Sequence, residues 1–432
     1  MKIKKLMCLA AIAVLLCSVS SCRSLTENEI TPQESSMQSF LRPVPGARNT
    51  AGMEAAKESS AETEQNVAVT VTEEVTVTEE LQETEKRITF MACGDNIIYY
   101  GNVRDAQSLA KNGEKYDFRP MFGPVADLIS AADIAFINQE TVMAGDGYEL
   151  SYYPRFNSPR EVGYNLVELG YDVVNIANNH MLDKGSAGLE RTIEFWKSMD
   201  CLMIGGYENQ EDYENIRITE KNGIKTAFLS YTYATNGISK SASSQLVIPY
   251  IKDEDIIRQT KKAKEAADFV IISVHWGDEG SFNPNAEQQR TAQLMADCGA
   301  DVIIGHHPHV IQPVEWLNGK DGNRTLCVYS LGNFAAEQAY SYNMLGGIIE
   351  FDIVSYGGRT VVENPIFRPT VFHFDSRFYN NKVYLLEDYT KELAASHGVR
   401  TYYKRTLTVE GLKKYVTDTI PEEFLAANDS AE

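Results

Sequence analysis

Three histidines fall within four positions of this 432-residue chain, in the segment Gly-His-His-Pro-His at 305–309. The segment directly follows Asp301–Ile304, an apolar run with the composition of a buried strand. A segment this rich in histidine, directly after a strand, has few purely structural explanations, and imidazole is a common metal-binding side chain in proteins. The spacing therefore predicts a metal site at the end of this strand.

Four other apolar segments also run directly into residues that could bind a metal. These are Asp95 after Ile88–Cys93, Glu140 after Asp133–Ile137, Asn179 and His180 after Asp172–Ala177, and His275 after Phe269–Val274. Taken singly, each has an ordinary explanation, as a turn, a helix cap or a buried core histidine. Because ligand sites in open α/β sheets lie outside the carboxyl ends of the strands, we expect these five strand ends to converge.

Helical patterns separate the apolar segments that would position these residues. The predicted helices are Pro159–Leu169, Gly188–Met199, Asp253–Ala267 and Ala286–Cys298, and further strands are predicted at Lys225–Tyr231 and Leu326–Ser330. This alternation predicts an α/β domain with buried, largely parallel strands. Beyond about residue 365 the alternation ends, and short helices are predicted at Leu385–Ala395 and Thr408–Tyr415.

The first 22 residues have the pattern of a secretory signal. Lys2, Lys4 and Lys5 precede the apolar run Leu9–Leu16, which is too short to span a bilayer. Small residues then lead into Cys22, a pattern that resembles the lipobox of bacterial lipoproteins. We therefore expect an extracytoplasmic protein anchored to the cell membrane through a lipidated Cys22. The alternative is an ordinary secretory signal in which this cysteine is incidental.

Residues 23–86 have the composition of a tether. They contain 13 Glu, no Asp and 5 Lys or Arg, and residues 69–80 repeat the sequence Val-Thr-Val-Thr-Glu-Glu. With little to bury and a high negative charge, this stretch is predicted to be a disordered acidic linker. The alternative is a solvated edge strand, because Val and Thr favour strands.

The formal net charge of −20 argues against a nucleic-acid partner. Proteins bind a phosphate backbone through a basic surface, but this chain has more acidic than basic residues.

Six motifs occur in an order that resembles the CapA family of capsule and poly-γ-glutamate synthesis proteins. They are Gly-Asp at 94–95, Asn-Gln-Glu-Thr at 138–141, Ala-Asn-Asn-His-Met-Leu-Asp at 177–183, His-Trp-Gly at 275–277, Gly-His-His-Pro-His-Val at 305–310 and Tyr-Ser-Leu-Gly-Asn-Phe at 329–334. Two smaller segments, at 154–159 and 231–237, are also similar to family segments. The resemblance covers roughly residues 88–370. It identifies the chain with a branch of the calcineurin-like metallophosphoesterases.

The resemblance implies a four-layer αββα sandwich at residues 87–375, followed by a helical C-terminal extension at 376–432. It also implies two divalent cations, of the Mn, Fe or Zn type. The implied metal ligands are Asp95, Glu140, Asn179, His275, His307 and His309. The implied catalytic residues are Asn179 and His180, the Asn-His pair of the family, in which His180 resembles the acid or phosphate-contacting histidine. The residues implied to contact and orient the metal ligands, without binding the metal themselves, are His306, Asn138, Asp183 and Asn333.

Two positions depart from the wider superfamily. Its first motif is Asp-x-His, but Asp95 is followed two positions later by Ile97, and Glu140 replaces the usual aspartate. Both departures look typical of the CapA branch. They leave open the number of metals and hydrolysis itself, and His306 could either replace the missing imidazole or lie behind the ligands.

Two functions therefore remain open. In the first, the protein is a metal-dependent hydrolase or transferase that acts on a phosphoester or an amide-type polymer at the cell envelope. In the second, it is a non-catalytic accessory module that helps to assemble, anchor or export an anionic capsule polymer. The implied partners are an anionic polymer or phosphoester substrate, the membrane through the lipid anchor, and membrane-embedded polymer synthase subunits.

Overall fold

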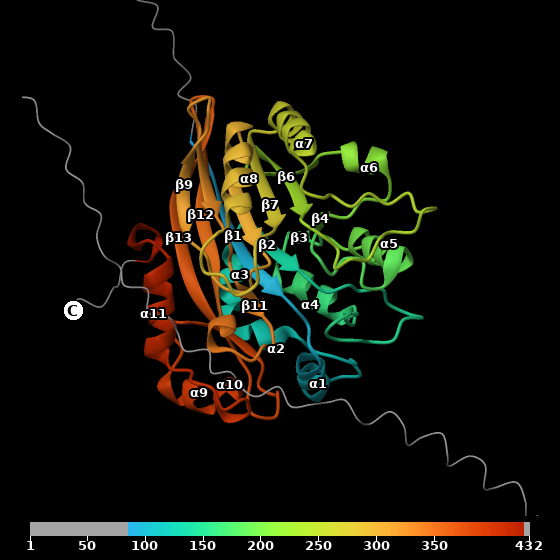
Figure 1. Cartoon of the computed structure of the whole chain (residues 1–432), viewed down its shortest axis with the longest axis vertical. Helices are drawn as coiled ribbons and strands as arrows, with labels where there is room; N and C mark the ends of the chain where they lie inside the picture. The colour runs from blue at the N-terminus through green and yellow to red at the C-terminus, as the bar shows by residue number, and fades with distance from the viewer. Residues whose placement is uncertain (1–84, 427–432) are drawn as a thin grey trace, which may run out of the picture. The chain divides into compact units, whose positions relative to one another are not determined.

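A computed structural model describes residues 85–426, and the signal, Cys22 and nearly all of the acidic linker lie outside these residues. The described residues form two β-sheets that pack face to face, with helices on the outer side of each (Figure 1). The order of layers is therefore helix, sheet, sheet, helix. The four-layer α/β architecture that the motifs implied is confirmed.

The first sheet is mixed, with the strand order β14-β13-β12-β1-β2-β3-β4, and β11 pairs with β1 off this path. Strands β1 to β4 are parallel, whereas β12, β13 and β14 are antiparallel to their neighbours. The strands are β1 (Lys86–Asn96), β2 (Ile134–Gln139), β3 (Val173–Asn175), β4 (Leu202–Ile204), β11 (Asn333–Ala335), β12 (Leu345–Tyr356), β13 (Arg359–His373) and β14 (Lys382–Leu385).

The second sheet has the order β5-β6-β7-β8-β10-β9. Its four central strands are parallel, and the two edge strands β5 and β9 are antiparallel to their neighbours. The strands are β5 (Arg217–Lys221), β6 (Ile224–Thr232), β7 (Phe269–His275), β8 (Val302–His306), β9 (Val314–Asn318) and β10 (Arg324–Val328).

Helices flank both sheets (Figure 1). The α-helices are α1 (Tyr100–Leu109), α2 (Arg119–Phe122), α3 (Ala126–Ala131), α4 (Glu161–Leu169), α5 (Gly185–Lys197), α6 (Gln210–Glu214), α7 (Asp253–Ala266), α8 (Ala286–Asp297), α9 (Lys391–Ser396), α10 (Gly398–Thr401) and α11 (Val409–Thr419). Short 3-10 helices occur at Gly123–Val125, Ser341–Met344 and Glu422–Phe424. Among the described residues, no helix has both the length and the apolar character that a membrane span requires.

Aromatic side chains fill the space between the two sheets. The ring of Phe90 on β1 lies 4.7 Å from that of Phe351 on β12 and 6.5 Å from that of Phe228 on β6. Phe269 on β7 lies 6.5 Å from Phe351, and all four side chains are buried. Burial of these rings removes apolar surface of both sheets from water, and this stabilises the packing of the two sheets into one core.

The register of the strands sets polar residues side by side at one end of this core. In the first sheet Asp95 pairs with Asn138, which pairs in turn with Asn175, and Asp95 also pairs with Asn333 on β11. In the second sheet His275 is the register partner of His306. The strands that carry these residues are parallel, so their carboxyl ends open on the same side.

All seven predicted strands and all four predicted helices of the α/β region are present, with shifted ends. The antiparallel strands β12, β13 and β14, which continue the first sheet to Leu385, were not predicted. The helix predicted at Leu385–Ala395 is wrong in its first half. Leu385 ends strand β14, which pairs with β13, and the helix begins only at Lys391. The domain boundaries predicted at residues 22, 86 and 375 remain predictions.

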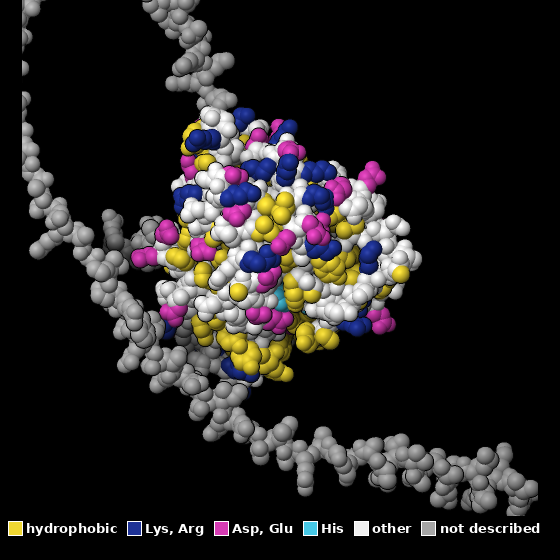
Figure 2. Space-filling view, turned by 45° about the horizontal axis from the view of Figure 1, so that its top comes forward, with side chains coloured by type: hydrophobic (Ala, Val, Ile, Leu, Met, Phe, Trp, Pro, Cys, Tyr) yellow, Lys and Arg dark blue, Asp and Glu magenta, His cyan; other side chains and the backbone are white. Residues whose placement is uncertain are grey.

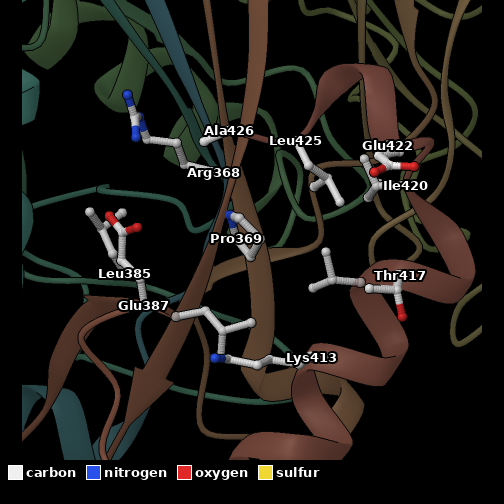
Figure 3. A pocket seen from close by; sticks show the side chains of 12 residues that line it. Arg368, Pro369, Leu385, Glu387, Lys413, Thr417, Ile420, Glu422, Leu425 and Ala426 are labelled. Carbon is white, nitrogen blue, oxygen red and sulfur yellow. The ribbon is translucent and has the colours of Figure 1, made fainter. Parts of the chain in front are cut away.

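A groove of about 510 Å³ lies between β13, β14 and α11 (Figure 3). Pro369, Leu385 and Leu425 contribute apolar surface to it, and Lys413 and Glu422 carry opposite charges around it. None of the candidate metal ligands lines this groove.

Glu337 is a buried acid that links the start of α1 to the segment after β11. Its Oε2 accepts a hydrogen bond from the backbone N–H of Gly101 at 3.0 Å, and burial raises its pKa to about 8. Between pH 4.5 and 8 the folded chain therefore keeps the Glu337 proton, whereas the unfolded chain loses it. As the pH rises through this range, Glu337 lowers the free energy of unfolding. We expect Glu337→Gln to raise the free energy of unfolding at pH 8 by up to about 4 kcal/mol, and to change it little at pH 4.5.

Urea unfolding at both pH values measures this effect. Glu265→Gln serves as the control, because Glu265 is exposed and its loss should leave the pH dependence unchanged. An equal change in stability for Glu337→Gln at the two pH values would contradict a proton held by burial.

Candidate metal centre

Two buried carboxylates form the centre of the polar cluster. Asp95 Oδ1 accepts a hydrogen bond from Asn138 Nδ2 at 2.8 Å, and its Oδ2 accepts one from the backbone N–H of His307 at 3.1 Å. By contrast, neither side-chain oxygen of Glu140 has a hydrogen-bond partner within residues 85–426, although the residue is fully buried. A buried carboxylate left in this way is costly unless a cation or a proton satisfies it.

The two acids have opposite pKa shifts. Burial, reinforced by the negative charge of Asp95, raises the pKa of Glu140 well above its usual range. Burial would also raise the pKa of Asp95, but contacts with His306 and His309 outweigh it and hold that pKa well below the usual range. Asp95 is therefore ionised, whereas Glu140 ionises only when a positive charge comes close to it.

Three imidazoles surround the carboxylates. Glu140 Oε1 lies 3.7 Å from His275 Nε2 and 3.8 Å from His309 Nε2, and His309 Nδ1 lies 3.3 Å from Asp95 Oδ2. The ring of His307 lies 4.8 Å from that of His275 and 5.8 Å from that of His309. The predicted convergence of these strand ends therefore occurs in the structure.

The imidazoles also differ in proton affinity. Burial lowers the pKa of His275 well below its usual range, and burial with the neighbouring His309 lowers that of His307 to about 3. For His309 the effect of burial is outweighed by Glu140 and Asp95, which raise its pKa to about 9. Two of the three rings are thus neutral at pH 7, which is the form that binds a metal.

The donor set fits a divalent cation. Candidate ligand atoms lie within 4.8 Å of one another in three groups, namely Glu140 with His275 and His307, Asp95 with Glu140 and His309, and Glu279 with His307 and His309. Mixed carboxylate and imidazole donors suit Zn, Mn and Fe. A cation would also satisfy the oxygens of Glu140. The cluster is therefore compatible with divalent metal binding.

The Asn-His pair after β3 lies against the same cluster. Asn179 Oδ1 accepts a hydrogen bond from His275 Nε2 at 3.0 Å, which places this amide oxygen among the candidate ligands. His180 turns instead towards Asp183, with 2.8 Å between Nδ1 and Oδ2, and its ring packs edge-on against Phe156. A proton on Nδ1 shared with the carboxylate leaves Nε2 as the free ring nitrogen of His180.

The remaining predicted residues support the cluster from behind. Asn138 links Asp95 to Asn175, whose Nδ2 donates to Asn138 Oδ1 at 2.8 Å. Asn333 Oδ1 lies 3.0 Å from His309 Nδ1, and His306 Nδ1 lies 3.3 Å from Asp95 Oδ1. His306 is fully buried and belongs to none of the three groups, so we expect it to support Asp95 and not to bind the metal.

The backbone of the histidine loop is held in an unusual conformation. His307 and His309 have positive φ angles of 100° and 56°, which side chains with a Cβ rarely adopt. Just before them, a Cβ at Gly305 would clash with the carbonyl oxygen of Tyr329, so only glycine allows β8 to pass so close to the end of β10. Strain of this kind persists where surrounding contacts fix it, here including the bond from His307 N–H to Asp95.

Three residues at the cluster escaped the sequence analysis. The ring of Tyr233 lies 4.6 Å from that of His307, and Asn236 Oδ1 accepts a hydrogen bond from Asn179 Nδ2 at 3.2 Å. Both belong to segment 231–237, whose similarity to the family was a usable signal. Glu279 follows His275 by four positions in a loop, and no periodic pattern marks it.

The sequences of two relatives agree with the motif series. The chain is 33% identical to the PGA biosynthesis protein CapA of Bacillus subtilis (strain 168) over 291 residues, which cover 66% of this chain and 74% of that protein. It is 34% identical to the capsule biosynthesis protein CapA of Bacillus anthracis over 194 residues, and there spans about half, 46%, of that relative. The solved structure of the calcineurin-like phosphoesterase YfkN from Bacillus subtilis aligns with 78% of this chain and 97% of that chain, at 14% identity and a TM-score of 0.40.

The family match covers more than half of the chain. Residues 89–338 match the family described as bacterial capsule synthesis protein PGA_cap. This range contains every candidate ligand, from Asp95 to His309. The resemblance to CapA proteins is confirmed, and this chain belongs to the PGA_cap family of bacterial capsule synthesis proteins.

Proposed function

We propose that the protein is a divalent-metal-dependent, phosphoesterase-like hydrolase that acts in the synthesis or export of an anionic capsule polymer of the poly-γ-glutamate type. One observation carries this proposal. The buried Glu140 carboxylate, without a hydrogen-bond partner within residues 85–426, faces His275 and His309. The segment after the neighbouring strand β3 carries His180, which is oriented by Asp183 and belongs to none of the ligand groups.

Two divalent cations are the proposed cofactors. The residues proposed to hold them are Asp95, Glu140, Asn179, His275, His307 and His309. Bound there, divalent cations supply a water of lowered pKa and positive charge for phosphoryl oxygens.

The proposed role of His180 is to hold a proton for the leaving group. In the doubly protonated ring, Nδ1–H donates to Asp183 and the proton on Nε2 is the one available to the leaving group, while Phe156 packs against the ring and restricts its rotation. Asp183 is itself held, because its Oδ2 also accepts the backbone N–H of Phe156 at 2.7 Å. His180 is 8% exposed, so its second nitrogen can face a bound phosphoester without being surrounded by water.

Ile97 favours a second candidate function, a non-catalytic accessory module with a structural or polymer-binding metal. It stands where the superfamily's first motif has a histidine, and its side chain is buried against Phe156 and Ala336. An aliphatic residue cannot bind a cation, so the centre has one imidazole fewer than a hydrolase of that type.

We further propose that the protein works outside the cytoplasm, anchored through a lipid on Cys22. The proposed partners are the anionic polymer and the membrane-embedded subunits that synthesise it. Retention of the protein in the membrane fraction after Cys22→Ser would contradict the anchor.

Polymer output in capsule-forming cells that rely on this protein separates the two functions. If the site is catalytic, His180→Ala and His307→Ala should both abolish most of the polymer at equal protein levels. Near-normal polymer with His180→Ala, together with its loss in His307→Ala, would favour the accessory module.

A further inference from the structure

Glu279 lies at the solvent-facing side of the metal cluster. One of its carboxylate oxygens lies within 4.8 Å of ring nitrogens of both His307 and His309. Its side chain is exposed, whereas the two imidazoles are buried. A histidine side chain is visible on the surface in Figure 2, with acidic side chains next to it. Glu279 therefore reaches the cluster from the side by which solvent and substrate would enter.

The loop that carries Glu279 is tied to the histidine loop. The backbone N–H of Gly280 donates to the carbonyl oxygen of Pro308 at 2.8 Å, and that of Trp276 donates to the carbonyl oxygen of His306 at 3.0 Å. One of these hydrogen bonds lies before Glu279 in the sequence and the other directly after it. Its position relative to the imidazoles is therefore set by the backbone of both loops.

The buried atoms at this point still have capacity to bind a cation. His307 is 3% exposed, and its Nδ1 has no hydrogen-bond partner within residues 85–426. Both carboxylate oxygens of Glu140 are also buried without a hydrogen-bond partner within these residues. Ile97, which directly follows β1, adds no donor, so an oxygen from Glu279 would complete a group that otherwise has only His307 and His309.

We propose that Glu279 is an additional carboxylate ligand, which closes the metal centre on its solvent side together with His307 and His309. This inference rests on the metal centre of the proposed function and adds a residue that the motif series does not supply. Because the side chain is exposed, it can move aside when a substrate oxygen takes its place.

Calorimetric titration of the metal-free full-length protein with Mn²⁺ tests this. Glu279→Gln removes the charge at nearly constant shape, and Asp278→Asn is the matched control. Asp278 is the adjacent acid, and its carboxylate accepts a hydrogen bond from Asn285 at the start of α8. We expect Glu279→Gln to weaken the binding of at least one Mn²⁺ by tenfold or more, or to lower the Mn²⁺ content after dialysis. Asp278→Asn should bind as the wild type does.

Asp95→Asn serves as the positive control, and thermal unfolding of the metal-free variants shows whether each is folded. Wild-type binding by Glu279→Gln, with weakened binding by Asp95→Asn, would overturn the role of Glu279 and leave the metal centre intact. Equal weakening by Glu279→Gln and Asp278→Asn would also overturn it, because the effect would then come from charge alone. A wild-type protein that binds no Mn²⁺ would overturn both the inference and the proposed centre.

Discussion

His180→Ala is expected to lower the turnover of a phosphodiester by about 10²–10⁴-fold while the protein keeps its fold and its metal. The ring belongs to none of the groups of candidate ligand atoms, so its loss removes a proton donor and no metal contact. Its pairing with Asp183 at 2.8 Å indicates a side chain that is oriented for one task. Steady-state turnover and metal content, measured on the same preparation, check this expectation.

A matched control for this experiment is His373→Ala. His373 is another buried histidine, and its Nδ1 lies 2.8 Å from the hydroxyl of Tyr389, among the C-terminal residues. Its loss should leave turnover per folded molecule unchanged, because His373 belongs to none of the groups of candidate ligand atoms, so the two variants should differ by the full effect. A His180→Ala protein that loses its metal would instead assign this residue to the ligands.

His307→Ala is expected to lower divalent metal affinity by more than about 100-fold, which corresponds to more than about 2.7 kcal/mol. Residues behind a metal ligand typically contribute 10- to 100-fold, and a direct ligand contributes more. His307 belongs to two of the three groups of candidate ligand atoms, so one substitution affects both. Competition with a chelator of known affinity measures the change.

His306→Ala provides the comparison within the same segment. His306 lies behind Asp95 and outside the three groups, so its loss should weaken metal binding by a smaller factor than that of His307. A larger effect for His306 than for His307 would place the missing imidazole at position 306 and reverse the assignment.

The sequence predicted the parallel part of the fold well because each strand there has a local signal. Segments such as Asp133–Ile137 and Phe269–Val274 are continuous apolar runs, as expected for strands buried on both faces. Each also ends in a polar residue, and parallel pairing turns these separate ends into one site. The candidate cluster could thus be located before any distance was known.

The antiparallel part escaped prediction because its signal is weaker. Strand β13 contains Pro365 and Pro369, and proline usually argues against a strand. In the structure β14 pairs only with residues 370–373, so most of β13 is an edge strand that tolerates proline. Many of its side chains are half-exposed, so it lacks the continuous apolar run that marked the other strands.

The parts of the site that escaped prediction lie in loops. Glu279 and Asn236 reach the cluster through tertiary contacts between loops, which no periodicity in the sequence encodes. The roles of Asn138 and His306 also depended on the structure. A residue next to a ligand in sequence could bind the metal or support it. Here Asn138 donates a hydrogen bond to Asp95, and His306 belongs to none of the three groups of candidate ligand atoms.

The most direct test of the catalytic metal centre is turnover of bis(p-nitrophenyl) phosphate by the purified full-length protein, before chelation, after chelation and after reloading with Mn²⁺. The metal content of each sample is determined in parallel. The proposed hydrolase predicts turnover that disappears with the metal, returns on reloading, and stays low in reloaded His180→Ala. A folded, fully loaded protein with no turnover above the His180→Ala level would contradict it.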